Sequence, residues 1–387
     1  MKRHVLVLPS FLECKWSGGG TFFREQAVIM SQLAGWEINM LMPCAQHVLK
    51  IRRRKLLMAS GIEIEKQNGI EIWLGFYPYY LPRKNRQAWK YFGEELFLQY
   101  VKKHGMPELI WAHAILNAGY LAQHLSKKYG VPYFIHEHLS MYLKQKMSGF
   151  LCHRVKSVID GAVYCAAVGE KLRLAMLRQT GAEEDKICII YNPVGFEFTD
   201  VTLPKHDFPP SPFIFVSTAY MRAEKNINKI IQAFAMIVDE NKNVRLIIGG
   251  NGNEENKLKN LAKDMHIMDY IEFVGKQNRQ QIYELLMRAN AFVAASDYES
   301  CGVALLEALS CGLPAITTKV GIAEKIINHE NGILIESPTD KNIASAMRVI
   351  LERNYEHADI QASAMAKFHP KIFAQQVQDT LCACERK

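Results

Sequence analysis

The sequence has no apolar run of the roughly 18–20 residues that a membrane-spanning helix needs. Its nine cysteines are odd in number, and no two of them are spaced as C-x-x-C. That pattern argues against a disulfide framework and against a zinc site built on cysteine pairs. We therefore expect reduced, mostly buried thiols and a cytoplasmic protein.

The amino terminus lacks the features of a secretory signal. Basic residues within 1–4 precede an apolar run, but this run is short and no small-residue cleavage site follows it. We expect a buried first strand over residues 5–8 instead.

The formal net charge is +8, and basic residues cluster over 50–55 and 83–86. A basic surface attracts nucleic acid, an anionic membrane or an acidic substrate, although an ordinary solvated surface explains the clusters equally well. No nucleic-acid-binding module is present, so we exclude that partner. The aromatic and basic segment 76–84 keeps peripheral contact with an anionic membrane open, with an ordinary loop as the alternative.

Short apolar runs alternate with amphipathic stretches, which predicts βαβ units and parallel sheets. The segment 207–212 holds three prolines, which neither a helix interior nor a central strand accepts. We therefore expect two domains, over residues 1–200 and 211–367. The predicted fold class is α/β, with two facing, doubly wound Rossmann-like domains and a ligand cleft between them.

The most informative stretch is 296–314, SDYESCGVALLEALSCGLP. A strand ends there, a polar loop follows, and a helix begins near Val303. Gly302 lets the backbone approach a ligand closely, and the N–H groups at a helix start favour an anion such as a diphosphate. The stretch therefore predicts an anion site at the start of this helix.

Two carboxylates bracket that helix start, Glu299 and Glu307, which are eight positions apart (307 − 299 = 8). If both were helical they would lie about 12 Å apart, which is wider than the roughly 5–9.5 Å of a glycosidase pair. The spacing suits two acceptors that grip opposite ends of a long polar ligand, with Glu299 on hexose hydroxyls and Glu307 on ribose hydroxyls. The alternative for Glu307 is a place on top of an amphipathic helix, but its apolar neighbours predict a buried acid that needs a partner.

The E-x7-E spacing, followed by Ala-Leu-Ser-Cys-Gly-Leu-Pro, resembles the donor-site motif of the family 4 retaining glycosyltransferases of the GT-B fold. Other segments resemble the same family in order and spacing. These are the glycine loop at 18–20 with the helix after it, the segment 189–194, the strand and glycine-rich turn at 246–252, the strand 271–275 and the turn and strand at 331–335.

The resemblance implies transfer of a hexose-type sugar, with retention, from a nucleotide diphosphate sugar to a glycan or lipid-linked acceptor. It points to surface polysaccharide or lipopolysaccharide-type synthesis, on or near the inner face of the membrane. It also implies that the tail 368–387 packs back on the first domain, that no cofactor is needed, and that the donor is held by the following residues: Gly19, Gly20, Arg222, Lys225, Gly275, Glu299, Ser300, Cys301, Gly302, Val303 and Glu307. The catalytic candidates are His138, Lys225 and Glu299.

In the family, a loop between a strand and a helix supplies an Arg and a Lys to the leaving diphosphate, where cations stabilise the growing negative charge. Lys225 matches the family Lys, whereas the Arg position falls on Tyr220. Either Arg222 substitutes for it or Lys225 acts alone. A Lys at a helix start is disfavoured by the dipole unless an anion binds there, so Lys225 and the start at Val303 would stand in for a divalent metal.

A second group of candidates follows the strand expected over 133–135. His138 matches a family His near the scissile bond, where a neutral imidazole would accept a hydrogen bond from the sugar or the acceptor. A packed, hydrogen-bonded His is the alternative. His136 and His138 suggest a metal, but no third ligand is apparent in the sequence, so we expect none. His113 ends another strand, and we expect it to line the cleft.

The sequence also bears on three other functions. Gly18, Gly19 and Gly20 do not have the spacing of a dinucleotide fingerprint, and no acid ends the second strand, which argues against a nicotinamide dehydrogenase. A sugar-nucleotide epimerase or hydrolase of the same fold remains open. So does a catalytically silent nucleotide-sugar-binding protein, because Tyr220 departs from the family pattern.

Overall fold

The computed structural model describes residues 2–12, 20–47, 61–79, 85–144, 146–203 and 210–385. The chain divides into two compact units, Met1–Tyr191 with Phe373–Lys387, and Asn192–Ile372. The expected boundary was near residue 200, whereas residues 192–200 lie in the second unit. The reason is a backbone contact, in which the N–H of Val194 donates to the carbonyl of Phe368 at 3.0 Å.

The first unit contains an eight-stranded sheet of order β3-β4-β2-β1-β5-β6-β7-β8, in which only the β3–β4 pair is antiparallel. The four central residues of β1 are fully buried and apolar, as a strand covered on both faces requires. The strands are β1 (His4–Pro9), β2 (Glu37–His47), β3 (Gly61–Gln67), β4 (Ile70–Tyr79), β5 (Leu109–His113), β6 (Tyr133–Glu137), β7 (Cys165–Ala167) and β8 (Ile187–Ile189).

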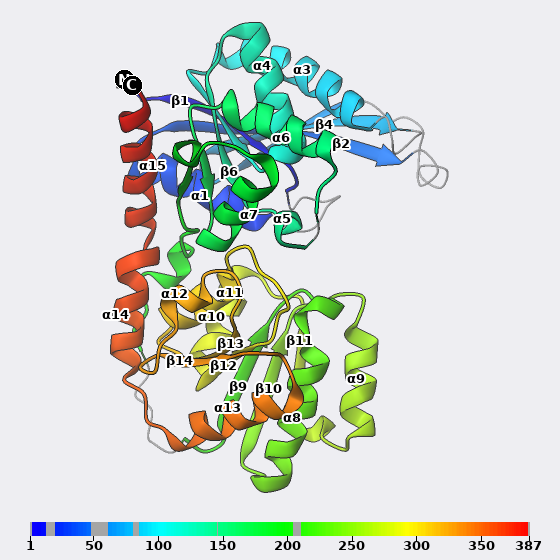
Figure 1. The fold of residues 1–387 in the computed structure, drawn as a ribbon, viewed down its shortest axis with the longest axis vertical. Coiled ribbons are helices and arrows are strands. Elements are labelled where there is room, and N and C mark those ends of the chain that lie inside the picture. Colours follow the sequence, from blue (N-terminus) through cyan, green and yellow to red (C-terminus); the bar gives the residue numbers. More distant parts are fainter. Residues whose placement is uncertain are drawn as a thin grey trace. The chain divides into compact units, whose positions relative to one another are not determined.

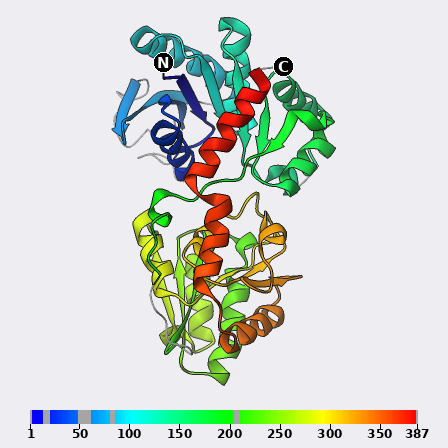
Figure 2. The same ribbon diagram turned by 90° about the vertical axis from the view of Figure 1, so that its left-hand side faces the viewer.

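Helices cover both faces of this sheet. The last helix returns to it and lies beside α1, with α3 and α4 on the other face (Figure 2). The ring of Phe373 in that last helix stacks near Trp111 and His136 of the sheet, at centroid distances of 6.3 and 5.9 Å. The helices are α1 (Thr21–Leu33), α3 (Asn85–His104), η3 (Ile115–Gly119), α4 (Tyr120–Tyr129), α5 (Met141–Lys144), α6 (Gly149–Asp160), α7 (Glu170–Thr180), η4 (Glu184–Lys186) and α15 (Pro370–Glu385).

The second unit contains a six-stranded, fully parallel sheet of order β11-β10-β9-β12-β13-β14 (Figure 1). Counted along the chain this is the 3-2-1-4-5-6 order of a doubly wound sheet, which reverses direction between β9 and β12. The strands are β9 (Phe213–Thr218), β10 (Val244–Gly249), β11 (Ile271–Gly275), β12 (Ala291–Ala294), β13 (Ala315–Thr318) and β14 (Gly332–Ile335).

The α-helices of the second unit have apolar faces that pack on the sheet or on one another. Helix α8, for example, buries eight residues, and α13 packs against it. The helices are η5 (Phe196–Phe198), η6 (Ala223–Lys225), α8 (Ile227–Glu240), α9 (Glu255–Asp264), η7 (Met268–Tyr270), α10 (Arg279–Arg288), α11 (Val303–Ser310), α12 (Ala323–Ile326), α13 (Asp340–Glu352) and α14 (His357–Phe368). Within the described ranges of the chain, no helix is both long enough and apolar enough to span a bilayer.

Glu71 ties the edge of the first sheet to helix α3. Its carboxylate accepts from Lys103 Nζ at 2.8 Å and from the indole of Trp73 at 3.2 Å, and its Oε2 lies 3.0 Å from His104 Nε2. Lys66 of β3 lies 3.2 Å away. The bond from Lys103, supported by these neighbours, lowers the pKa of Glu71 to about 2. The carboxylate is therefore charged at every pH at which the protein is handled.

We expect Glu71→Gln to lower the free energy of unfolding by about 1–3 kcal/mol at neutral pH, because charge-assisted hydrogen bonds contribute about that much. A lowered pKa gives stability that is present above the unfolded value near 4.5 and is lost as the pH falls towards 2. The difference between the variant and wild type should therefore shrink below pH 4.5. Denaturant unfolding from pH 7 to pH 3 measures it, with Glu95→Gln, at an exposed position of α3, as the control. A constant difference across that range would contradict the charge assignment.

Candidate functional site

In the second unit, the loops that follow β9 and β12 meet at the point where the strand order reverses. Asp297 N–H donates to the carbonyl of Glu224 at 2.9 Å. Asn226 donates from its side-chain amide to the carbonyl of Ala295 at 2.9 Å and to the Asp297 carboxylate at 2.6 Å. Ligands of doubly wound sheets bind outside the carboxyl ends of the strands at this reversal, so these two joined loops are the expected place for one.

Helix α11 begins directly after the second of these loops. Gly302 precedes it with φ +93°, and no side chain caps the helix. A Cβ at Gly302 would meet only Leu305, at 4.0 Å, so glycine is needed here for its backbone conformation and the space around it is open. The first N–H groups of Val303 and its neighbours, with the positive end of the helix, suit an anion.

Glu299 and Lys225 meet in front of this helix. The Lys225 ammonium, at the end of η6, pairs with Glu299 Oε1, and Ser296 Oγ donates to the same oxygen at 2.9 Å. Lys225 and Glu299, both predicted to bind the donor, are thus in contact although 74 positions separate them in the sequence. Glu299 lies in the loop before α11, so the helical estimate of its separation from Glu307 does not apply.

Glu307 is 3% exposed, on a helix with six buried residues. Its Oε1 pairs with Arg279 Nη1 at the start of α10. The Arg279 guanidinium also lies 5.0 Å from the centre of the Phe198 ring. The sequence predicted that this buried acid needs a partner but did not identify Arg279, because a partner 28 positions away depends on how α10 and α11 pack.

Tyr220, the departure from the family pattern, is 53% exposed. Its ring centre lies 4.7 Å from the guanidinium of Arg222, which is a cation–π distance. Arg222 is itself exposed and directly precedes η6, which ends at Lys225. Tyr220, which stands where the family has an Arg, therefore packs against Arg222 of the same loop.

Close backbone contacts hold both loops. Gly321 has φ +57°, and a Cβ there would lie 2.3 Å from the carbonyl oxygen of Cys301 in the Glu299 loop. Gly250 and Gly252 approach the Lys225 loop in the same way, with a Cβ placed 1.9 and 2.2 Å from backbone oxygens. Gly275 has φ +70°, and its carbonyl accepts from Gly250 N–H at 2.7 Å.

Ser300 and Cys301 lie between Glu299 and the helix start. Cys301 is buried, and burial raises its pKa to about 12, so its thiol stays protonated and is no nucleophile. Its carbonyl accepts from Ile322 N–H at 3.2 Å, which fixes the loop from the side of the next strand.

In the first unit, three histidines gather at the carboxyl ends of β5 and β6. His113, His136 and His138 are 0%, 1% and 6% exposed, and one nitrogen of each lies within 4.8 Å of those of the other two. The expectation that His136 and His138 have no third potential metal ligand is therefore wrong. It failed because His113 is paired directly with His136 in the parallel register of β5 and β6.

Glu137, between two of these histidines, is fully buried and fixes the loop that follows β6. Its carboxylate accepts from the N–H groups of Ile115, His138 and Leu139 at 2.9, 2.9 and 2.8 Å. The hydroxyl of Tyr142 donates at 3.1 Å. Burial raises the pKa of Glu137, while these four donors act in the opposite direction.

Gly20 precedes α1 with φ +84°, and a Cβ there would lie 2.8 Å from the carbonyl oxygen of Phe11. The rings of Phe22 and Phe23 that follow it lie 5.0 and 5.1 Å from the ring of His138. The predicted donor contacts of Gly18 and Gly19 lie outside the described residues, as do the basic clusters at 50–55 and 83–84.

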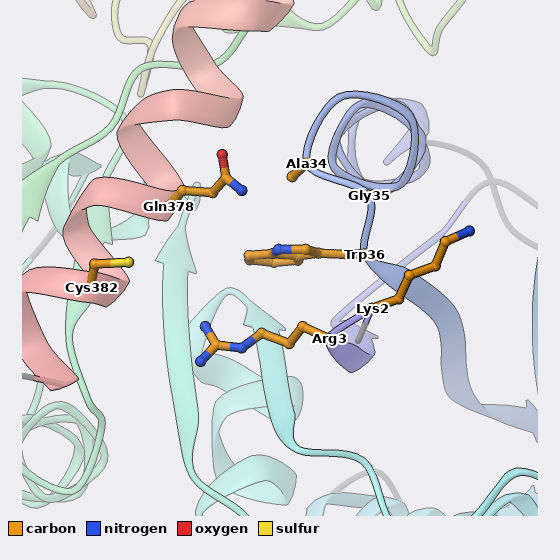
Figure 3. Close-up of a pocket in the computed structure, with 7 residues that line it drawn as sticks. All are labelled: Lys2, Arg3, Ala34, Gly35, Trp36, Gln378 and Cys382. Carbon is orange, nitrogen blue, oxygen red and sulfur yellow. The ribbon is translucent and has the colours of Figure 1, made fainter.

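A cavity of about 460 Å³ lies at the opposite, amino end of β1 in this unit. The indole of Trp36 lies between the side chains of Arg3 and Gln378 at its centre (Figure 3). Because doubly wound sheets bind their ligands at the carboxyl ends of the strands, this cavity is not the expected donor or acceptor site.

Part of the chain is similar in sequence to known glycosyl transferases. Residues 199–367 match the family described as glycosyl transferases group 1. The N-acetyl-alpha-D-glucosaminyl L-malate synthase of Bacillus anthracis is 30% identical over 181 residues, which are 46% of this chain and 47% of that protein. The chain thus spans about half the length of this curated relative.

Solved structures match over almost the whole chain. A sucrose-phosphate synthase from Thermosynechococcus elongatus has a TM-score of 0.77 at 19% identity, covering 99% of this chain and 100% of that one. Anabaena Alr3699/HepE, in complex with UDP and glucose, has a TM-score of 0.73 at 16% identity, covering 98% and 100%. These likenesses establish the GT-B fold for the whole chain, and the match to the group 1 glycosyl transferases covers residues 199–367.

Proposed function

We propose that the chain is a retaining glycosyltransferase that takes a hexose-type sugar from a nucleotide diphosphate sugar. The observation that carries the proposal is the uncapped start of α11, flanked by the pairs Lys225–Glu299 and Arg279–Glu307. An anion site next to two acids fits a ligand that carries both phosphates and hydroxyl groups.

The pairing of the acids explains how a diphosphate can bind beside them. Unpaired carboxylates would repel a doubly charged diphosphate, by about 1 kcal/mol or more for each pair of charges at contact distance. Lys225 and Arg279 compensate Glu299 and Glu307. The donor then gains hydrogen bonds from its hydroxyl groups to the carboxylate oxygens without a net electrostatic penalty.

In the proposed reaction, the bond between the anomeric carbon and the phosphate oxygen breaks, and a bond to the acceptor oxygen forms on the same face. The leaving phosphate takes the proton of the acceptor hydroxyl, so charge and atoms balance without a protein base. Lys225 and the N–H groups of α11 stabilise the charge that develops on the phosphate, in the place of a divalent metal. His138, as a neutral imidazole, hydrogen-bonds the sugar or the acceptor.

We further propose a glycan or lipid-linked acceptor, in surface polysaccharide or lipopolysaccharide-type synthesis, with peripheral contact to the inner face of the membrane. The support is by similarity. The Anabaena structure holds UDP and glucose. Another curated relative, from Mycobacterium tuberculosis, is named GDP-mannose-dependent alpha-(1-6)-phosphatidylinositol dimannoside mannosyltransferase.

Incubation of the purified chain with a panel of UDP-, GDP- and ADP-sugars tests the reaction. Free nucleotide should be released from one donor at a rate that rises at least about tenfold when lipid extract or oligosaccharide is added. The anomeric configuration of the product, read by NMR, should equal that of the donor. Equal release with and without acceptor would instead identify a hydrolase. A converted sugar would identify an epimerase, and binding with no release under any condition would identify a silent binding protein.

Glu307→Gln tests the ribose assignment. Hydrogen bonds to a charged group contribute about 1.5–3 kcal/mol, so donor affinity should fall about 10-fold or more, as measured by calorimetry. Glu272→Gln, at an exposed ion pair with Arg288 in the same unit, is the matched control and should leave affinity unchanged.

Because Glu307→Gln removes the charge that pairs with the half-buried Arg279, the variant should also lose stability. The double variant Glu307→Gln with Arg279→Gln carries no lone charge and should regain much of that stability. Donor affinity should stay low in the double variant. Recovery of affinity together with stability would mean that Glu307 only balances Arg279.

A further inference from the structure

We propose that His113, His136 and His138 form a binding site for one divalent transition-metal ion such as Zn²⁺ in the first unit. The site goes beyond the proposed transfer reaction and does not depend on it. The three histidines are brought together by the way in which β5 and β6 align. His113 of β5 is the direct partner of His136 of β6, and His138 follows His136 by two positions, so strand geometry brings the three rings to one place.

The distances between the rings suit one ion. Two nitrogens that bind the same zinc at about 2.0–2.1 Å lie about 3.3 Å apart in tetrahedral geometry. Nδ1 of His113 and Nε2 of His138 are 3.1 Å apart. One nitrogen of each of the three rings lies within 4.8 Å of those of the other two, so rotation of the side chains can bring the three rings to one ion.

The hydrogen bond of His136 fixes which of its nitrogens can bind an ion. Its Nε2 lies 2.9 Å from the carbonyl oxygen of Ile190, which can only accept, so the ring donates there and carries its lone pair on Nδ1. A backbone carbonyl bound to the far nitrogen of a ligating His is the usual support of a metal site. The carbonyl of Ile190 provides this support for His136.

Aromatic side chains line the three histidines. The rings of Phe23 and Trp111 lie 4.7 and 4.5 Å from that of His113, and Phe22 lies 5.0 Å from that of His138. A set of three histidines with no cysteine favours zinc, cobalt or nickel over magnesium or calcium, which prefer oxygen ligands.

An ion bound here takes Nε2 of His138, the imidazole proposed above to face the sugar. Metal loading and sugar transfer are therefore expected to compete at His138. This consequence is separate from binding itself, which is measured without donor or acceptor.

The test uses full-length protein freed of metal with a chelator and then titrated with Co²⁺, which reports its coordination by visible absorption. Wild type should bind one equivalent with the intense bands of four- or five-coordinate cobalt, and Zn²⁺ should displace it. His136→Gln and His138→Asn should each weaken binding by more than about 100-fold, since even outer residues of such sites cost 10–100-fold. The matched control, His124→Gln, changes a half-buried His that pairs with Glu94 in the same unit and should bind as wild type does.

Crystals of wild type soaked in Zn²⁺ give a second measurement that needs no variant to fold. An anomalous peak between the three rings supports the proposal. No stoichiometric cobalt binding, a peak elsewhere, or equal binding by wild type and the histidine variants would overturn it. None of these measurements depends on nucleotide release. Failure of the metal site can therefore be distinguished from failure of the proposed transferase activity.

Discussion

Strands β9 and β12 pair in parallel although two other strands and several helices separate them in sequence. In the first unit, β1 and β5 pair in the same way across three other strands. Parallel pairing turns the carboxyl ends of neighbouring strands to one edge of the sheet. The loops with Lys225 and Glu299 meet at such an edge, and so do His113 and His136. In each unit, the order of the strands in the sheet therefore determines which candidate residues lie close together.

Charge compensation is the second constraint on the donor-side residues. The helix start attracts anions, and two carboxylates beside it would oppose them. Each carboxylate is matched by one base from a different element, Lys225 from η6 and Arg279 from α10. The acids can therefore serve as acceptors for hydroxyl groups while the helix start keeps its positive potential.

Much of this arrangement is predictable from the sequence. The strand, loop and helix around Glu299 and Glu307 appear where the residue pattern places them, because apolar strand residues, a glycine and an apolar helix are local signals. Arg279 was not predicted, since its contact depends on packing between two helices. His113 was missed as the third histidine for a similar reason, because the sequence of a single strand does not show how it aligns with its neighbour.

One missed element did have a local signal. Strands β3 and β4 form a hairpin around Asn68 and Gly69, which have φ +51° and +80°. An Asn-Gly pair between alternating apolar residues is the typical two-residue hairpin turn. Strand β3, at the edge of the sheet, is polar and mostly exposed, so it lacks the apolar run that marks the buried strands.

The glycine contacts described above have a consequence for protein engineering. Gly321 shapes the Glu299 loop through its backbone, and any side chain there would meet the carbonyl of Cys301 at 2.3 Å. Tyr220 and Arg222, in contrast, project from the neighbouring loop into solvent. Directed evolution towards a new sugar donor should therefore randomise positions 220 and 222 and keep glycine at 321, so that diversity is concentrated where the scaffold tolerates it.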